Sequence, residues 1–300
     1  MKFANAPVSY GVFGELTIEG ASTTDLLSAM AQAGYHGTEL GPPGFFGSPT
    51  EAADALRTAG LTAAGVYVPL HTQDRGPVLQ RDLERFEITM AEMAAADATG
   101  PLILADEGDA ALLREPRKNP GRMLDEEGWQ RLLAVLTQAA RQAEDHGLMV
   151  SVHPHISTYI ELPSEIERLL TDTDLSLTFD VGHIVLAGGD GPELYQAWRE
   201  RINHVHVKDV RPQVLEQARA SGREDFDSWW EGVATPLGAG DGQVQEFCTV
   251  LAASGYDGWV VVEQDRAPLT AHTVTQVFAE QSANLRWLER TFAAVEAPTS

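Results

Sequence analysis

Histidines and carboxylates recur in this chain at the ends of short apolar runs. Asp180 closes the run Ser-Leu-Thr-Phe-Asp, and Glu263 closes the run Trp-Val-Val-Val-Glu. Six of the nine histidines lie at or just beyond such ends: His71, His153, His155, His183, His204 and His206. Imidazole nitrogens and carboxylate oxygens are the ligands that Mn, Co, Zn, Fe and Mg ions take in proteins. The pattern therefore predicts a bound divalent metal ion at one edge of the fold.

The run over 202–209, Ile-Asn-His-Val-His-Val-Lys-Asp, alternates in polarity. In an extended strand this spacing turns His204, His206 and Lys208 to one side and the valines to the other. Three buried polar groups on one side are costly without partners, so a functional role is favoured over a structural one. His206 lies level with Asp180 and is a predicted metal ligand. Lys208 lies higher, near the substrate.

These residues need a scaffold that brings strand ends together. Short apolar runs alternate with amphipathic segments, which is the pattern of repeated strand–helix units and a parallel sheet. Strands are predicted at Val8 to Val12, Gly37 to Leu40, Ala63 to Val68, Pro101 to Leu104, Leu148 to His153, Leu175 to Asp180, Asn203 to Val207 and Trp259 to Glu263. Helices are predicted at Thr23 to Ala33, Thr50 to Ala59, Arg81 to Ala96, Asp125 to His146, Pro163 to Leu170, Pro192 to Glu200, Gln243 to Ala253 and Ala271 to Arg290.

Eight strand–helix pairs predict an α/β fold, a (β/α)8 TIM barrel formed by residues 1–300 as a single domain. A doubly wound sheet is the rival, but no G-x-G-x-x-G follows an early strand. In a barrel, the carboxyl ends of the strands form the catalytic rim. Strands five to eight would there bring four side chains to one point: His153, Asp180, His206 and Glu263.

Two further rim residues have less certain roles. Glu39 ends the second predicted strand on the opposite wall of the barrel. It is expected to bind substrate hydroxyls, to act as a second acid or base, or to be structural. His71 stays open between a functional and a structural role.

Two segments lack a regular pattern. Residues 108–121 are charged and contain Pro116 and Pro120, which indicates an exposed loop over the barrel mouth. Residues 212–242 are expected to form a lid-like insertion, since long loops commonly cover barrel active sites. Phe226, Trp229 and Trp230 within it would either cap the substrate or form a contact in a homo-oligomer.

The composition restricts the partners. The net charge of −23, from 44 acidic and 21 basic residues, repels nucleic acid and anionic lipid surfaces. No apolar stretch is long enough to span a bilayer, and the first residues lack the apolar core of a signal peptide. The single cysteine, Cys248, indicates a reducing compartment. We therefore expect a cytoplasmic enzyme that binds a small molecule.

The motifs together resemble a known superfamily. They are Gly37-Thr-Glu-Leu-Gly, His153-Pro-His, Asp180-Val-Gly-His-Ile-Val-Leu-Ala-Gly-Gly, His204-Val-His-Val-Lys-Asp and Gly255-Tyr-Asp-Gly-Trp-Val-Val-Val-Glu. Over nearly its full length, the chain resembles the xylose-isomerase-like sugar phosphate isomerase/epimerase superfamily. Within it, the His-Pro-His, Ala-Gly-Gly-Asp and Lys-Asp motifs and the aromatic segment before Pro236 resemble the inosose (2-keto-myo-inositol) dehydratases. The Asp-x-x-His pair also resembles endonuclease IV, but the acidic charge argues against DNA as a substrate.

The resemblance implies a ligand set from strands five to eight, namely His153, Asp180, His206 and Glu263. We expect the metal to be Mn or Co, with Zn, Fe and Mg as alternatives. The epimerases of the superfamily carry glutamate at the position of His153, and they use two glutamates as acid and base on opposite faces of the substrate. The histidine therefore favours a dehydratase over a ketose 3-epimerase.

The expected reaction is the elimination of water from a keto-polyol, an inosose or a 3-keto sugar, through a metal-stabilised enediolate. Glu263 or Glu39 is expected to remove the α proton. His155, His183 or Lys208 is expected to protonate the departing β-hydroxyl. Two alternatives remain. One is a metal-dependent sugar isomerase or ketose 3-epimerase, and the other is a non-catalytic barrel subunit or sugar-binding protein.

Overall fold

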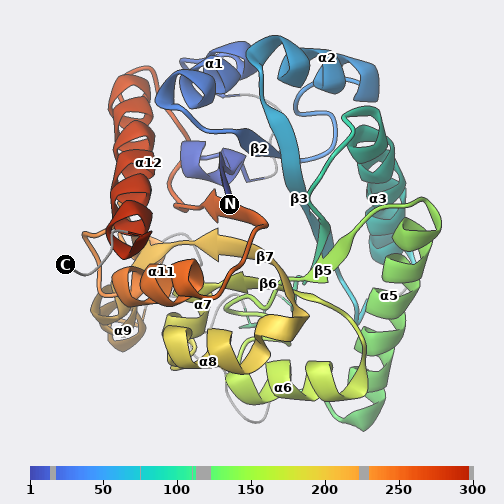
Figure 1. The fold of residues 1–300 in the computed structure, drawn as a ribbon. Helices are drawn as coiled ribbons and strands as arrows, with labels where there is room; N and C mark the ends of the chain where they lie inside the picture. The colour runs from blue at the N-terminus through green and yellow to red at the C-terminus, as the bar shows by residue number, and fades with distance from the viewer. Residues whose placement is uncertain (14–17, 75, 110, 113–122, 223–229, 297–300) are drawn as a thin grey trace.

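The computed structural model describes residues 1–13, 18–74, 76–109, 111–112, 123–222 and 230–296. Eight parallel strands form a closed barrel in the order β1-β10-β7-β6-β5-β4-β3-β2, as predicted (Figure 1). Their bounds are β1 Lys2–Asn5, β2 Gly37–Leu40, β3 Thr62–Leu70, β4 Leu102–Asp106, β5 Val150–Val152, β6 Leu177–Asp180, β7 Ile202–Val207 and β10 Trp259–Val262. A separate two-stranded sheet pairs β8 (Asp209–Val210) with β9 (Ala234–Thr235).

The helices lie outside the strands and surround them (Figure 1). They are α1 Thr23–Ala33, α2 Pro49–Ala59, α3 Pro77–Ala95, α5 Glu126–Asp145, α6 Pro163–Asp172, α7 Val181–Leu186, α8 Gly191–Trp198, α9 Pro212–Ala220, α11 Val244–Ala253 and α12 Val274–Glu296. Ser22 and Ser48 begin α1 and α2 with capping boxes, each side chain accepting a hydrogen bond from the third helical amide. These two serines thus define where α1 and α2 begin.

The first strand is not where the sequence predicted it. The apolar segment Val8 to Val12 was expected to be a strand, but the structure has a 3-10 helix, η1, at Pro7–Tyr10. Proline at position 7 supplies a helical φ and no amide hydrogen, and Gly11 ends the turn with a φ of 77°. The strand is instead β1, which pairs with β10 from Lys2 opposite Trp259 to Asn5 opposite Val262.

Two helices, α7 and α9, were not predicted from the sequence. His183 was expected in a loop but lies in α7, which Asp180 begins by accepting hydrogen bonds from the amides of Gly182 and His183. The segment 212–242 was read as irregular, yet it contains α9. Phe226, Trp229, Pro116 and Pro120, named in the two loop predictions, lie outside the described residues.

Alternate residues of the strands face two different cores. Val260 and Val262 of β10 belong to the large cluster that includes the helices, whereas Trp259 and Val261 belong to a small cluster with Ala4 and other alanines. Because successive strand residues point to opposite faces, the small cluster fills the inside of the barrel. It forms an apolar floor, and polar side chains replace it toward the carboxyl ends. Among the described residues, no helix is long and apolar enough to cross a membrane.

Candidate metal and substrate site

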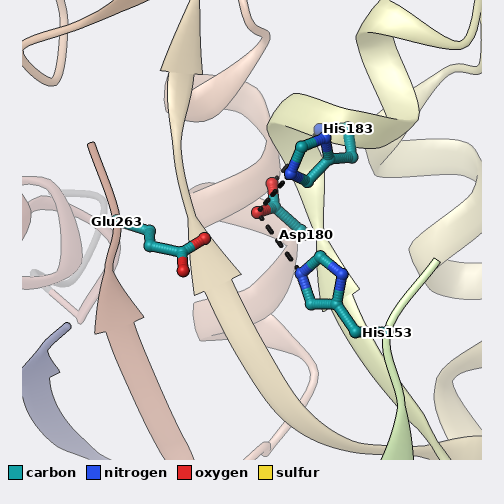
Figure 2. A group of neighbouring side chains, drawn as sticks. All are labelled: His153, Asp180, His183 and Glu263. Atoms are coloured by element: carbon teal, nitrogen blue, oxygen red, sulfur yellow. Dashed lines mark hydrogen bonds and ion pairs between the residues drawn. The ribbon is translucent and has the colours of Figure 1, made fainter. Parts of the chain in front are cut away.

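The carboxyl ends of four neighbouring strands bring the predicted ligands together. Asp180 ends β6 and is the register partner of His206 in β7. His153 directly follows β5, and Glu263 directly follows β10. Figure 2 shows Asp180 between His153 and His183, with the Glu263 carboxylate facing them from the end of β10. All five side chains are buried.

The distances between these side chains match the spacing of ligands around one ion. Asp180 Oδ2 lies 3.7 Å from His153 Nε2 and 3.8 Å from His206 Nδ1. His206 Nδ1 also lies 3.2 Å from Glu263 Oε2. Two atoms bound to a tetrahedral metal at about 2.1 Å are about 3.4 Å apart. The group therefore fits a metal ion of this kind.

The hydrogen-bonding state of the same atoms supports the fit. His153 Nε2, Asp180 Oδ2 and His206 Nδ1 are buried, and none of them forms a hydrogen bond with a described residue. Burying polar atoms without partners costs free energy, and native proteins pair the great majority of them. The two histidine nitrogens both lie close to Asp180 Oδ2, so a single cation between the three atoms would satisfy all of them.

His183 is a second candidate for the fourth ligand. One donor atom each from His153, Asp180, His183 and Glu263 lie within 4.8 Å of one another, and His183 Nε2 is 3.8 Å from Asp180 Oδ2. However, His183 Nε2 also lies 2.9 Å from Lys208 Nζ, where it accepts a hydrogen bond from the ammonium group. His183 Nε2 thus already has a hydrogen-bond partner, whereas His206 Nδ1 has none among the described residues.

The Lys208 ammonium group lies between three carboxylates. Its Nζ is 2.9 Å from Glu263 Oε2, 3.0 Å from Asp265 Oδ2 and 3.5 Å from Asp180 Oδ2. Burial lowers the pKa of Lys208, but the three carboxylates outweigh burial and raise that pKa above its usual value. The side chain is therefore held as a cation.

The two predicted carboxylate ligands, Asp180 and Glu263, are ionised. Burial raises the pKa of Asp180 and of Glu263, but the Lys208 charge and neighbouring histidines outweigh it, so both pKa values lie below their usual range. A metal ion binds carboxylates in this deprotonated form.

Glu39 lies in a second cluster beneath the first. Its Oε1 accepts hydrogen bonds at 2.8 Å from Nε2 of His204 and at 2.8 Å from Nε2 of His206. Burial raises the pKa of Glu39, but the two histidines outweigh it and lower that pKa to about 2. Because Nε2 of His206 is the nitrogen that binds Glu39, Nδ1 is the nitrogen that faces Asp180 and Glu263.

His155, also predicted as a proton donor, lies against His183 with ring centroids 3.8 Å apart and the rings tilted by 44°. Its Nδ1 lies 2.8 Å from the carbonyl oxygen of Ile156, so Nδ1 carries the proton and donates it there. Burial lowers the pKa of His155 to about 3, which leaves the ring neutral. His71, in contrast, lies outside both clusters and pairs through Nδ1 with Asp82 at 2.8 Å.

A cavity of about 560 Å³ opens beside the four predicted ligands, His153, Asp180, His206 and Glu263, which we call the ligand group. Its wall includes the predicted residues Glu39, His153, His155, Lys208 and Glu263. It also includes acids and a phenol that the sequence analysis missed: Tyr67, Glu107 and Asp265. The missed acids carry the same signal as Glu263, because Glu107 directly follows β4 and Asp265 lies two residues after Glu263.

Comparison with known proteins gives concordant results. A family model described as "Xylose isomerase-like TIM barrel" matches residues 27–291. The chain is 34% identical to the rhizopine catabolism protein MocC of Rhizobium meliloti, over 83% of this chain and 76% of that protein. It is 31% identical to the inosose dehydratase of Lactiplantibacillus plantarum, over 82% of each chain. A crystal structure of the IolI protein with a bound zinc atom shares the fold, with a TM-score of 0.69 and 16% identity, over 96% of this chain and 98% of that one.

Proposed function

The chain belongs to the xylose isomerase-like TIM barrel family, and from that premise we propose that it is a metal-dependent dehydratase that removes water from a keto-polyol. The relatives named inosose dehydratase support an inosose as the substrate class. The zinc-containing structure and the group of histidines and acids support a divalent metal ion as the cofactor.

One observation carries the proposal. Buried donor atoms of His153, Asp180 and His206, none of which forms a hydrogen bond with a described residue, lie around one point beside a cavity large enough for a cyclic polyol. We assign the metal ligands as His153, Asp180, His206 and Glu263. His206 is preferred over His183 because its Nδ1 is unpartnered, while His183 Nε2 accepts a hydrogen bond from Lys208. The metal is Mn or Co in this proposal, with Zn, Fe and Mg as alternatives.

A divalent metal bound there supplies a positive charge that lowers the pKa of a C–H bond next to the substrate carbonyl. Glu263 is the proposed base. Its Oε2 contacts His206 and Lys208, which leaves Oε1 for the substrate in the cavity. Glu39 is not the base, because its Oε1 already accepts hydrogen bonds from two buried histidines.

We further propose that residues 1–300 form one domain in which the insertion at about 212–242 acts as a lid. Its described part packs on the site, since Trp230 stacks on His183 with ring centroids 6.0 Å apart. Trp230 also belongs to a cluster with Leu215 of α9 and Ile156. The net charge of −23 supports an uncharged substrate over a polyanion.

Elemental analysis tests the ligand set. Purified wild-type protein is expected to hold one equivalent of metal, and Asp180→Asn and His206→Ala are expected to hold little. His183→Ala is the matched comparison, because it removes a neighbouring imidazole that we do not assign as a ligand, and it should keep the metal. Stoichiometric metal in both Asp180→Asn and His206→Ala would refute the site.

The reaction is tested with 2-keto-myo-inositol and protein loaded with Mn or Co. Mass spectrometry is expected to show a product lighter by one water molecule. An isomerase or epimerase would instead give a product of unchanged mass that contains solvent deuterium. That result, or turnover of a simple ketose without loss of water, would contradict the dehydratase assignment.

A further inference from the structure

Elimination of water needs a group that gives a proton to the departing hydroxyl, and the three groups expected from the sequence do not suit this task. The proton of His155 is on Nδ1 and is donated to a carbonyl oxygen. His183 Nε2 accepts a hydrogen bond from Lys208, so this nitrogen has no proton to give. Lys208 is paired with three carboxylates that raise its pKa, so its ammonium group gives up a proton poorly. The proton donor must therefore lie elsewhere on the cavity wall.

Glu107 and Tyr67 form a hydrogen-bonded pair on that wall. Tyr67 lies on β3 and Glu107 directly follows β4, and the Tyr67 hydroxyl lies 2.7 Å from Glu107 Oε1. Both residues line the cavity together with Glu263. The Tyr67 ring is edge-on to His153, with ring centroids 6.0 Å apart, so the pair is next to the ligand group.

From this geometry, we propose that Glu107 is the acid that protonates the departing hydroxyl, and that Tyr67 positions its carboxyl group. The inference rests on the proposed dehydratase function. The hydrogen bond from Tyr67 uses one carboxyl oxygen and leaves the other for the substrate. Two carboxyl groups, Glu263 from β10 and Glu107 from β4, then serve the same cavity from different strands.

The chemical environment of Glu107 agrees with this role. Burial raises the pKa of Glu107 above its usual value, and the hydrogen bond from Tyr67 acts in the opposite direction. Other charged groups around it are His71, Asp82 and Asp106 on neighbouring segments and Arg85, which lines the same cavity. A carboxylic acid is an effective proton donor when its pKa lies close to the working pH.

The step is balanced without any further reactant. The base takes the proton from the carbon next to the carbonyl, and the electron pair of that C–H bond passes into the carbon framework. The pair then forms a C=C bond as the C–O bond to the β-hydroxyl breaks. The hydroxyl takes the proton of Glu107 and leaves as water. The base then returns its proton to solvent and Glu107 takes one proton back from solvent, so both groups end as they began. No group is oxidised or reduced overall.

Deuterium exchange separates this role from that of the base. In D₂O, Glu107→Gln should still exchange the α hydrogen of the recovered keto-polyol, because Glu263 is intact. Release of water should fall by roughly 100-fold or more, the usual contribution of general acid catalysis. The metal content should equal that of wild type. Glu92→Gln is the control, since Glu92 is a buried carboxyl on α3 that binds the Gly44 amide, outside the cavity wall, and it should behave as wild type.

Tyr67→Phe tests the positioning role through a pH profile. An acid works only while protonated, so the rate of elimination falls as the pH rises through the pKa of Glu107. The Tyr67 hydrogen bond lowers that pKa, so its removal should move this limb of the profile to higher pH.

Each outcome decides the inference. The role of Glu107 would be overturned if Glu107→Gln eliminated water at the wild-type rate. It would also be overturned if that variant lost hydrogen exchange and elimination to the same extent. Either result would leave the dehydratase proposal standing. An unmoved pH profile in Tyr67→Phe would overturn the positioning role. Wild-type protein that releases no water from the keto-polyol would refute the proposed function and this inference with it.

Discussion

At the scale of single residues, the site depends on which nitrogen of His206 carries the proton. Glu39 accepts the Nε2 hydrogen of His206 and thereby orients the ring so that Nδ1 faces Asp180 and Glu263. Carboxylate partners of this kind orient ligating histidines in metal sites and make them more basic. In the proposed site, Glu39 would therefore act on the metal through His206 rather than as a ligand.

Replacing Glu39 with glutamine should weaken metal binding by about 10- to 100-fold, the usual effect of losing such a partner. The amide can accept one hydrogen bond but no longer offers a negative charge to two imidazoles. Competition with a chelator measures the dissociation constant. Glu92→Gln should retain the wild-type affinity, and an unchanged affinity in Glu39→Gln would show that Glu39 does not orient the ligand.

The sequence predicted which side chains meet at the rim, but not the contacts that surround them. His153, Asp180 and Glu263 could be found because each ends an apolar run at the same level of the barrel. Glu107 carries the same signal, yet nothing along the chain distinguishes an acid that faces the cavity from one that forms a salt bridge at the rim. Its contact with Tyr67 links residues 40 positions apart and appears only in the folded chain.

At the scale of elements, the strand–helix alternation specified the barrel, and the errors lie where a short apolar segment suited two structures. Val8 to Val12 reads as a strand by composition, but Pro7 and Gly11 favour a tight turn. Helix α7 has only 6 residues and follows a strand directly, so no periodic pattern marks it. What starts it is the Asp180 side chain, one oxygen of which caps the helix while the other faces the ligand group.

One loop near the site is built around a single carboxylate. Asp209, which is fully buried, accepts hydrogen bonds from the amides of Gly238, Gly240 and Gly242 at 2.8, 2.9 and 3.1 Å. A Cβ atom at Gly240 would lie 2.5 Å from Asp209 Oδ1, so only glycine allows this approach. The carboxylate next to Lys208 thus fixes the end of the 212–242 insertion.

Asp209→Ala should therefore lower the free energy of unfolding by about 3 kcal/mol, because it leaves several backbone donors without their acceptor. Urea denaturation measures the change. The exposed Asp257 gives a matched control, since Asp257→Ala removes a carboxylate that is not buried and should change stability by less than about 0.5 kcal/mol. Equal stability of the two variants would mean that Asp209 does not hold the loop.

At the scale of the whole molecule, negative charge is concentrated in the site as well as on the surface. Glu39, Asp180 and Glu263 are buried near one rim, Asp265 beside them is half-buried, and Lys208 is the cation placed among these carboxyl groups. The net charge of −23 adds a long-range field that attracts cations and repels anions. A divalent metal ion is therefore favoured by both the local and the overall charge, and an uncharged polyol meets no repulsion.

Metal binding should consequently stabilise the whole barrel, because the ligands come from four strands and are brought together only in the folded chain. At a free metal concentration 100 times the dissociation constant, the folded state gains about 2.7 kcal/mol, which raises the Tm of a chain of this length by roughly 4 °C. Thermal unfolding of chelator-treated protein with and without added Mn or Co measures the shift. Asp180→Asn should show no shift, because it lacks the oxygen on which the donors converge. A rise in Tm of the same size in that variant would place the stabilising ion at a different site.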